Sequence, residues 1–185
     1  MKYFVLITLL FVAGCSSSVP TLQQYLLRAD APGQYAVQDQ SNVVGIGVVS
    51  VAPYIDGLGL VLETSAGEVR VARDHQWAEP LRESLRIFFA REISSDTGRV
   101  IRAQRSGEAD WQRRVDIRVD QLHGTAAGEA TLVAYWSVFD VTQRTVISEN
   151  GFTDSEPLGE DGYHSLVQAQ KKLLLRLASA IAATL

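Results

Sequence analysis

Cysteine is almost absent from this chain of 185 residues, which contains a single one, Cys15. A disulfide needs two cysteines whose Cα atoms come within about 7 Å of each other, so the chain cannot form one within itself. Its stability must therefore come from a packed hydrophobic core. The residues from Cys15 onward number about 170, a length that suits one domain with a substantial core.

Positive charge is also scarce. Lysine and arginine together number 17 against 21 aspartates and glutamates, which gives a formal net charge of −4. The sequence has no run of basic residues, whereas nucleic-acid-binding domains carry a basic patch or stripe. The composition therefore argues against a nucleic-acid partner.

Long hydrophobic runs are missing as well. The apolar run at residues 3–13 is far shorter than the roughly 20 residues that cross a bilayer as a helix. It follows Lys2 and ends in small residues, which is the layout of a secretory signal. Residues 12–15 have the sequence VAGC, a lipobox, whose cysteine thiol receives a lipid before the signal is cut off. We predict a signal peptide at 1–14, acylation of Cys15, and a tether at 15–24 that joins the lipid to the domain.

Catalytic and metal-binding motifs are missing from the sequence. His75, His123 and His164 share no spacing that would place two imidazoles on one metal ion, so we expect scattered surface histidines. No GxSxG pentapeptide occurs, and acylation removes Cys15 as a nucleophile. We predict a protein that is not an enzyme and has no catalytic residue, metal site or cofactor.

Two further patterns have structural explanations. Gly45 and Gly47 superficially match a dinucleotide loop, but Ser50 stands where the third glycine would be and strand residues follow. Close backbone packing within a strand explains these glycines better. Asp116 and Asp120 alternate with apolar residues, which is typical of the solvated face of a strand rather than of an acid-base pair.

Strands are predicted wherever β-branched or alternating apolar segments are bounded by turn residues. Strict alternation at 115–119 indicates a sheet with one wet face. Tyr135 and Trp136 fall on opposite faces of a long strand, which forms the clearest hairpin with the segment after it. Some seven strands are predicted, at residues 24–28, 43–51, 58–64, 69–72, 115–119, 130–140 and 145–153, with 100–103 as a further short candidate.

Two segments have helical periodicity. Apolar residues recur at the spacing of one helix face over 77–93 and again over 163–183, and Pro80 fits only the first turn of the earlier helix. The first stripe consists of Leu81, Leu85, Phe88, Phe89 and Ile93. The order of elements predicts an α/β or α+β fold, a single domain over 25–185 in which two main helices pack on a mixed β-sheet.

Two local features leave alternatives open. Trp77 precedes the first helix, where it either anchors the helix to the sheet or forms part of a binding surface. Tyr54, Ile55 and Leu58 lie near a turn, where apolar side chains mark a contact surface if exposed or are buried against the sheet. Neither feature by itself indicates a reaction.

Three segments, taken in order, resemble the PqiC (YmbA) family of transport auxiliary lipoproteins. They are YLL at 25–27, VGIGVVSVAPYID at 44–56 and HQWAEPL at 75–81. The family-motif residues, which the resemblance implies to be structural or interfacial, are Tyr25, Leu26, Leu27, Tyr54, Ile55, Asp56, Trp77, Ala78 and Glu79. The chain departs from the family at Val48, where proline is usual, and at Gly57 and Leu58, where Arg-Pro is usual, so the turn contacts are expected to differ.

The resemblance implies a function that composition and spacing do not show. It implies a non-catalytic accessory lipoprotein on the periplasmic face of the Gram-negative outer membrane, which partners MCE-domain or ABC lipid transporter subunits and supports envelope integrity. Ser16 agrees with this location, because lipoproteins of this kind that stay in the inner membrane carry aspartate there. The domain would dock as a monomer or as a homo-oligomer. The alternative is a periplasmic lipid-binding carrier with an apolar pocket for an acyl chain.

Overall fold

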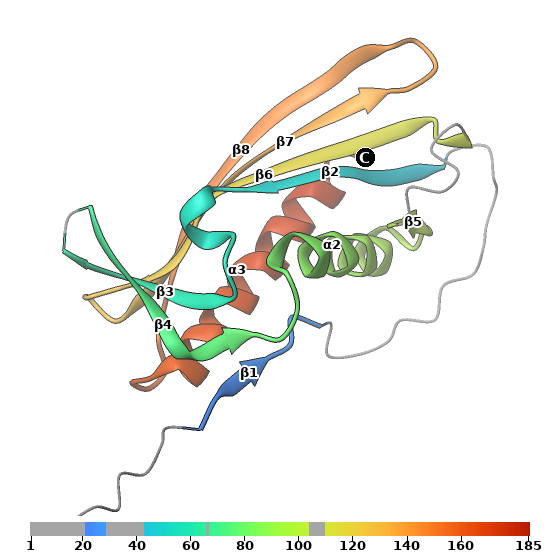
Figure 1. The fold of residues 1–185 in the computed structure, drawn as a ribbon. Helices are drawn as coiled ribbons and strands as arrows, with labels where there is room; N and C mark the ends of the chain where they lie inside the picture. Colours follow the sequence, from blue (N-terminus) through green and yellow to red (C-terminus); the bar gives the residue numbers. More distant parts are fainter. Residues whose placement is uncertain (1–20, 29–42, 66, 104–109) are drawn as a thin grey trace, which may run out of the picture.

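The computed structural model describes residues 21–28, 43–65, 67–103 and 110–185. The predicted signal peptide, Cys15 and the tether as far as residue 20 lie outside these ranges. The elements, labelled as in Figure 1, are β1 (Gln23–Tyr25), β2 (Val44–Val51), the 3-10 helix η2 (Pro53–Ile55), β3 (Gly59–Ser65), β4 (Glu68–Trp77), α2 (Leu81–Thr97), β5 (Ile101–Arg102), β6 (Arg113–Thr125), β7 (Glu129–Asp140), β8 (Thr145–Pro157) and α3 (Tyr163–Ala182).

The eight described strands form one mixed sheet in which β6 is the central strand. One edge of β6 pairs in parallel with β2 over residues 113–119 and then with β3 at 124–125. Its other edge pairs with β7 in an antiparallel ladder, and β8 continues the sheet beyond β7. The β3–β4 hairpin carries β1 on its outer side. The predicted mixed sheet with two helices is confirmed, and the fold is α+β because both helices lie on one side of the sheet.

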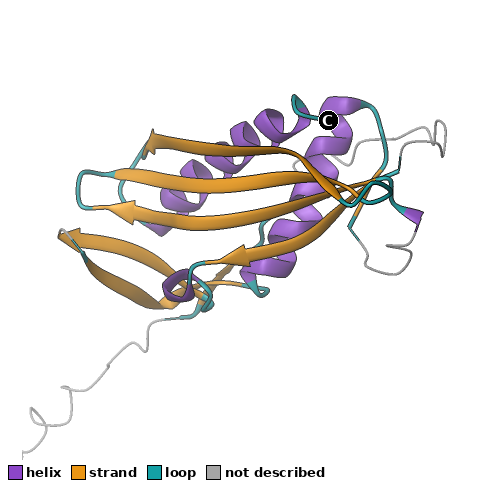
Figure 2. Cartoon of the chain, turned by 90° about the horizontal axis from the view of Figure 1, so that it is seen from above, coloured by secondary structure: helices purple, strands orange, loops and turns teal. Residues whose placement is uncertain are grey.

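Both helices cover the same face of the sheet, as Figure 1 and Figure 2 show from two directions. α2 packs on β2 and on α3, while α3 packs on β7 and β8. The predicted stripe of α2 is fully buried, from Leu81 to Ile93. α3 contributes its own buried stripe, which consists of Leu166, Leu173, Leu174, Leu177 and Ile181. The hydrophobic core therefore lies between the helices and one sheet face, and no helix of the described ranges covers the opposite face.

The helix and strand boundaries around Trp77 differ from the prediction. α2 begins at Leu81 rather than at residue 77, with Pro80 as its N-cap, and β4 runs on as far as Trp77. The reason is β1, whose residues pair with the last three residues of β4. The sequence pattern predicts that this strand ends at residue 72. The pairing with β1, a distant segment, extends it to Trp77.

Ion pairs hold α3 along the edge strand β8. Glu156 accepts hydrogen bonds from Lys172 at 2.9 Å and from Arg176 at 2.8 Å, and Arg176 also pairs with Asp154 at 2.9 Å. The hydrogen bond from Lys172 is the largest cause that lowers the pKa of Glu156, and it outweighs the opposing effect of burial. Asp154 and Glu156 therefore lie on the face of β8 that points toward the helices.

Neither α2 nor α3 is long and apolar enough to cross a membrane, and the same holds for every helix within the described ranges.

Candidate functional site

The three motif segments meet at one end of the sheet. Tyr25 of β1 lies directly opposite Trp77 of β4 in the parallel ladder. The amide of Ala78 donates to the carbonyl oxygen of Tyr25 at 2.8 Å, and the amide of Trp77 donates to that of Leu58 at 2.7 Å. η2, the helix of the second segment, contacts both β3 and β6. The fold thus joins segments that are far apart in the sequence.

An aromatic stack fastens β1 to the start of α3. The Tyr25 hydroxyl shares a hydrogen bond of 3.0 Å with Nδ1 of His75. The other side of the His75 ring stacks on Tyr163, with 4.2 Å between ring centroids and 20° between the planes. Burial raises the pKa of Tyr25. The stacked side chains link β1, β4 and α3, in addition to the backbone ladder between β1 and β4.

A second tyrosine and histidine form a chain of polar contacts that ends on a carboxylate. The Tyr54 hydroxyl lies 2.9 Å from Nδ1 of His123, and Nε2 of His123 lies 3.3 Å from Oε2 of Glu63. Burial, followed by the nearby charge of Glu63, raises the pKa of Tyr54. The chain therefore ties η2 to β6 and β3.

The surface position that we expected for the histidines is correct for His164 only. His164 is exposed, His75 is half-buried in the aromatic stack, and His123 is buried. Their partners Tyr25 and Tyr54 come from segments 50 and 69 residues away. Sequence spacing gives no signal for such pairs.

The charged motif residues secure the start of α2. Asp56 accepts hydrogen bonds from Arg82 at 2.8 and 2.5 Å, one to each carboxylate oxygen. Glu79 accepts from Arg28 at 2.8 Å and from the Ser84 hydroxyl at 3.2 Å. Both carboxylates therefore hold a loop against the first turns of the helix.

The apolar motif residues divide between core and surface. Leu27, Ile55 and Trp77 are buried in the core, whereas Leu26 is exposed. Leu58, which lies just after the second motif segment, is also exposed. Trp77 thus anchors β4 beneath the helix start, which resolves the alternative left open by the sequence. Most motif residues pack in the core or hold neighbouring segments together. An exposed motif residue such as Leu26 has its side chain available to a partner.

The sheet face away from the helices carries the other candidate surface. The predicted alternation along β6 is confirmed, because Val115, Ile117 and Val119 are buried while Arg118 is exposed. On β7, Tyr135 is exposed and its neighbour Trp136 is buried. We call this surface the open face; its residues come from β2, β6, β7 and β8 and include Val48, Ser50, Arg114, Asp116, Arg118, Tyr135, Ser137, Phe139, Glu149 and Gly151.

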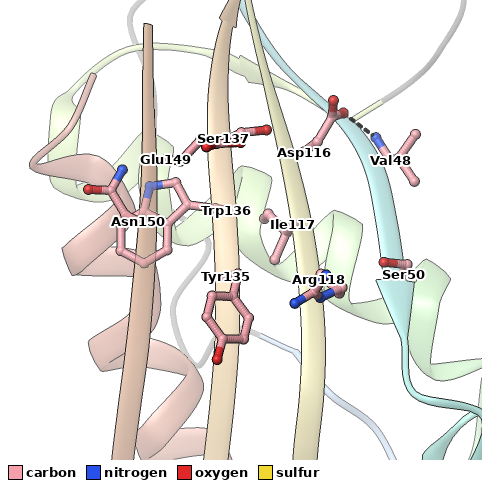
Figure 3. Close-up of a pocket in the computed structure, with 10 residues that line it drawn as sticks. All are labelled: Val48, Ser50, Asp116, Ile117, Arg118, Tyr135, Trp136, Ser137, Glu149 and Asn150. Atoms are coloured by element: carbon pink, nitrogen blue, oxygen red, sulfur yellow. Dashed lines mark hydrogen bonds between the residues drawn. The ribbon is translucent and has the colours of Figure 1, made fainter. Parts of the chain in front are cut away.

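A bulge in β2 projects Val48 onto the open face. The register between β2 and β6 shifts between Ile46 and Val49, so one extra residue is left without a ladder partner. Asp116 satisfies this backbone by accepting a hydrogen bond from the Val48 amide at 2.8 Å (Figure 3). The Val48 side chain is 52% exposed, which is unusual for a valine in the middle of a sheet.

Two arginines lie over aromatic rings on the same face. The guanidinium carbon of Arg118 is 4.8 Å from the ring centroid of Tyr135, and that of Arg114 is 4.8 Å from the centroid of Phe139. Both pairs have cation–π geometry. Tyr135 also lies over Gly151 on β8, where a Cβ atom would come within 3.3 Å of its ring. Cross-strand register, which the sequence does not give, creates these pairs.

The open face is shallow and has mixed polarity. A depression of about 380 Å³ lies between Val48, Arg118, Tyr135 and Glu149, as Figure 3 shows. Tyr135 is 43% exposed, and Val146 and Ile147 on β8 are also exposed. A flat surface with exposed apolar groups and arginine–aromatic pairs suits contact with a protein better than enclosure of a small molecule.

Within the described ranges, no group of three histidine, cysteine, aspartate or glutamate side chains could hold a metal ion.

Comparison with known proteins shows the family. The model of the family described as ABC-type transport auxiliary lipoprotein component matches residues 25–182. The chain therefore belongs to this family, which confirms the resemblance predicted from its motifs. The Intermembrane transport lipoprotein PqiC of Escherichia coli (strain K12) is 27% identical over 183 residues, covering 98% of this chain and 95% of the relative. The protein of the same name from Shigella flexneri matches with the same identity and coverage.

Solved structures share the fold. A crystal structure of an uncharacterized protein superposes with a TM-score of 0.75 at 24% identity, covering 89% of this chain and 98% of the other. A protein from Xanthomonas campestris superposes with a TM-score of 0.64 at 19% identity, covering 88% and 90%. At these identities the likeness concerns the fold alone.

Proposed function

We propose that this chain is a non-catalytic accessory lipoprotein of a lipid transport system that spans the Gram-negative envelope. In this proposal, acyl chains on Cys15 hold the protein on the periplasmic face of the outer membrane. The domain docks onto MCE-domain or ABC transporter subunits, as a monomer or as a homo-oligomer, and supports envelope integrity. Membership of the auxiliary family and the likeness to intermembrane transport lipoproteins support this role.

The observation that carries the docking step is the open face. Both helices cover one side of the sheet, and no described helix covers the other side, as Figure 2 shows. Val48, Arg118 and Tyr135 are exposed on that side. Tyrosine and arginine are the residue types enriched at the energetic centres of protein interfaces. The Tyr135 ring is held in place by Arg118 on one side and Gly151 on the other, so little side-chain freedom is lost on docking.

The alternative role, a periplasmic lipid carrier, requires an enclosed apolar cavity for an acyl chain. Between helices and sheet, the described residues instead form a filled core. The depression on the open face is lined by Asp116, Arg118 and Glu149 as well as by apolar groups. The structure therefore favours the accessory role over the carrier.

Affinity purification tests the proposal. The full lipoprotein would be recovered from gently solubilised envelopes after crosslinking, and copurifying proteins would be identified by mass spectrometry. We expect transporter subunits to be recovered, and Arg118→Glu to lower their yield about tenfold or more, the effect of losing a central interface residue. Arg99→Glu, the same charge reversal at another exposed arginine, should leave the yield unchanged.

Two outcomes would count against the proposal. Recovery of the protein alone with stoichiometric lipid would favour the carrier. Equal yields from Arg118→Glu and Arg99→Glu would show that docking uses another surface. A urea unfolding curve for each variant guards against loss of fold. We expect Arg99→Glu to change the free energy of unfolding by no more than about 0.5 kcal/mol, and Arg118→Glu to cost about 1 kcal/mol, because it loses the contact with Tyr135 and the ion pair with Asp120.

A further inference from the structure

Two exposed leucines flank the first described strand. Leu22 precedes β1 and is 49% exposed, and Leu26 follows it and is 52% exposed. Side chains alternate along an extended chain, and here Tyr25 and Leu27 point toward the stack and the core. Leu22 and Leu26 therefore project to the opposite side, away from the core. Neither belongs to the hydrophobic cluster of the domain.

The chain before β1 is short. Cys15 precedes Leu22 by seven residues, and an extended chain spans at most about 3.6 Å per residue. Leu22 must then lie within about 25 Å of the Cys15 backbone. A domain of about 160 residues has a radius of gyration near 15 Å, hence a diameter near 40 Å. If Cys15 is held in a bilayer, the β1 end cannot move away from the membrane by even one domain diameter.

β1 also lies at the border of the domain. It pairs with β4 alone among the described strands, and Figure 1 places it at the lower margin of the fold, where the chain enters. The nearby charges of Arg28 and Glu79 neutralise each other in an ion pair of 2.8 Å. An apolar pair beside a neutralised charge can enter the headgroup layer without bringing a net charge with it.

We propose that the β1 end of the domain rests on the lipid surface, with Leu22 and Leu26 inserted into the boundary between headgroups and acyl chains. This inference rests on the proposed acylation of Cys15, and it adds a second contact to that anchor. Apolar side chains bury about 5–10 Å deep in this layer. The contact fixes how the domain stands on the membrane and therefore the direction in which the open face is presented to the transporter.

Depth-dependent quenching tests the contact. The full acylated lipoprotein would be reconstituted in vesicles of phosphatidylethanolamine and phosphatidylglycerol. Single cysteines would replace Leu22 or Leu26 and carry a fluorophore, and quenching by lipids with nitroxide-labelled acyl chains would be measured. The thioether at Cys15 leaves no competing thiol. Val48→Cys on β2 and Val146→Cys on β8 are matched controls, because these residues are 52% and 55% exposed and both strands lie on the other side of the fold from β1 in Figure 1.

We expect quenching at positions 22 and 26 to be about threefold or more above that at positions 48 and 146, since only the former pair would lie within the bilayer boundary. Equal quenching at all four positions, with the acyl groups verified by mass spectrometry, would overturn the membrane contact and leave the anchor intact. Absence of acyl groups from the purified protein would overturn the anchor and the contact together. Unfolding curves of the four variants confirm that each is folded.

Discussion

Replacing Cys15 with alanine is expected to remove the protein from the outer membrane. In the proposed anchor the thiol of Cys15 accepts the lipid before the signal is cleaved, so Cys15→Ala should accumulate as an uncut precursor without acyl groups. Stable anchoring needs two lipid signals, because a single chain binds membranes only marginally. Fractionation of inner and outer membranes, with mass spectrometry of the N-terminal peptide, measures both effects.

Ser17→Ala is the matched control for Cys15→Ala. It changes a small side chain two residues away without touching the lipid acceptor, so normal processing and outer-membrane recovery are expected. An outer-membrane yield of Cys15→Ala equal to that of Ser17→Ala would contradict the lipoprotein anchor. It would also remove the basis of the membrane contact at Leu22 and Leu26.

Replacing Gly45 with alanine is expected to destabilise the domain strongly. A Cβ atom at this position would lie 2.3 to 2.4 Å from three ring carbons of Trp111, far inside van der Waals contact. Trp111 is buried and cannot move aside without disturbing its neighbours. Overpacking of this kind costs about 1–3 kcal/mol, so we expect a loss of about 2–3 kcal/mol in the free energy of unfolding, measured by urea denaturation.

Gly57→Ala is the control for this packing effect. Among the described residues, nothing lies within 4 Å of a Cβ atom at Gly57, so the change in the free energy of unfolding should stay within about 0.5 kcal/mol. If Gly45→Ala and Gly57→Ala behaved alike, the close approach of Trp111 to β2 would be wrong. The larger effect at Gly45 would explain why a glycine stands in a buried strand.

Much of the fold was predictable because local patterns dominate its elements. The helical stripe from Leu81 to Ile93 and the alternation at 115–119 follow directly from the periods of helix and strand. The order of strands could not be predicted. β6 pairs with β2, β3 and β7, and such pairings depend on contacts between segments far apart in the sequence.

The candidate site was predictable only in its parts. The motif residues were found by resemblance, yet most of them turn out to fasten the domain together, as the Tyr54–His123–Glu63 chain shows. The alternation of apolar and polar residues along β6 predicts a solvated sheet face. The contact between Arg118 and Tyr135 depends on the register between β6 and β7. The sequence alone predicts neither the histidine that each tyrosine contacts nor the register between β6 and β7.

The docking of the open face onto a transporter subunit is tested most directly by a photocrosslinking amino acid placed at Tyr135 in the full lipoprotein, in living cells. We predict crosslinks from position 135 to a subunit of the transport system, and none to that subunit from Ile87 on the helical side, whose exposure is similar. Crosslinks to the transporter from position 87 alone would contradict the account, because they would place the partner on the opposite side of the domain.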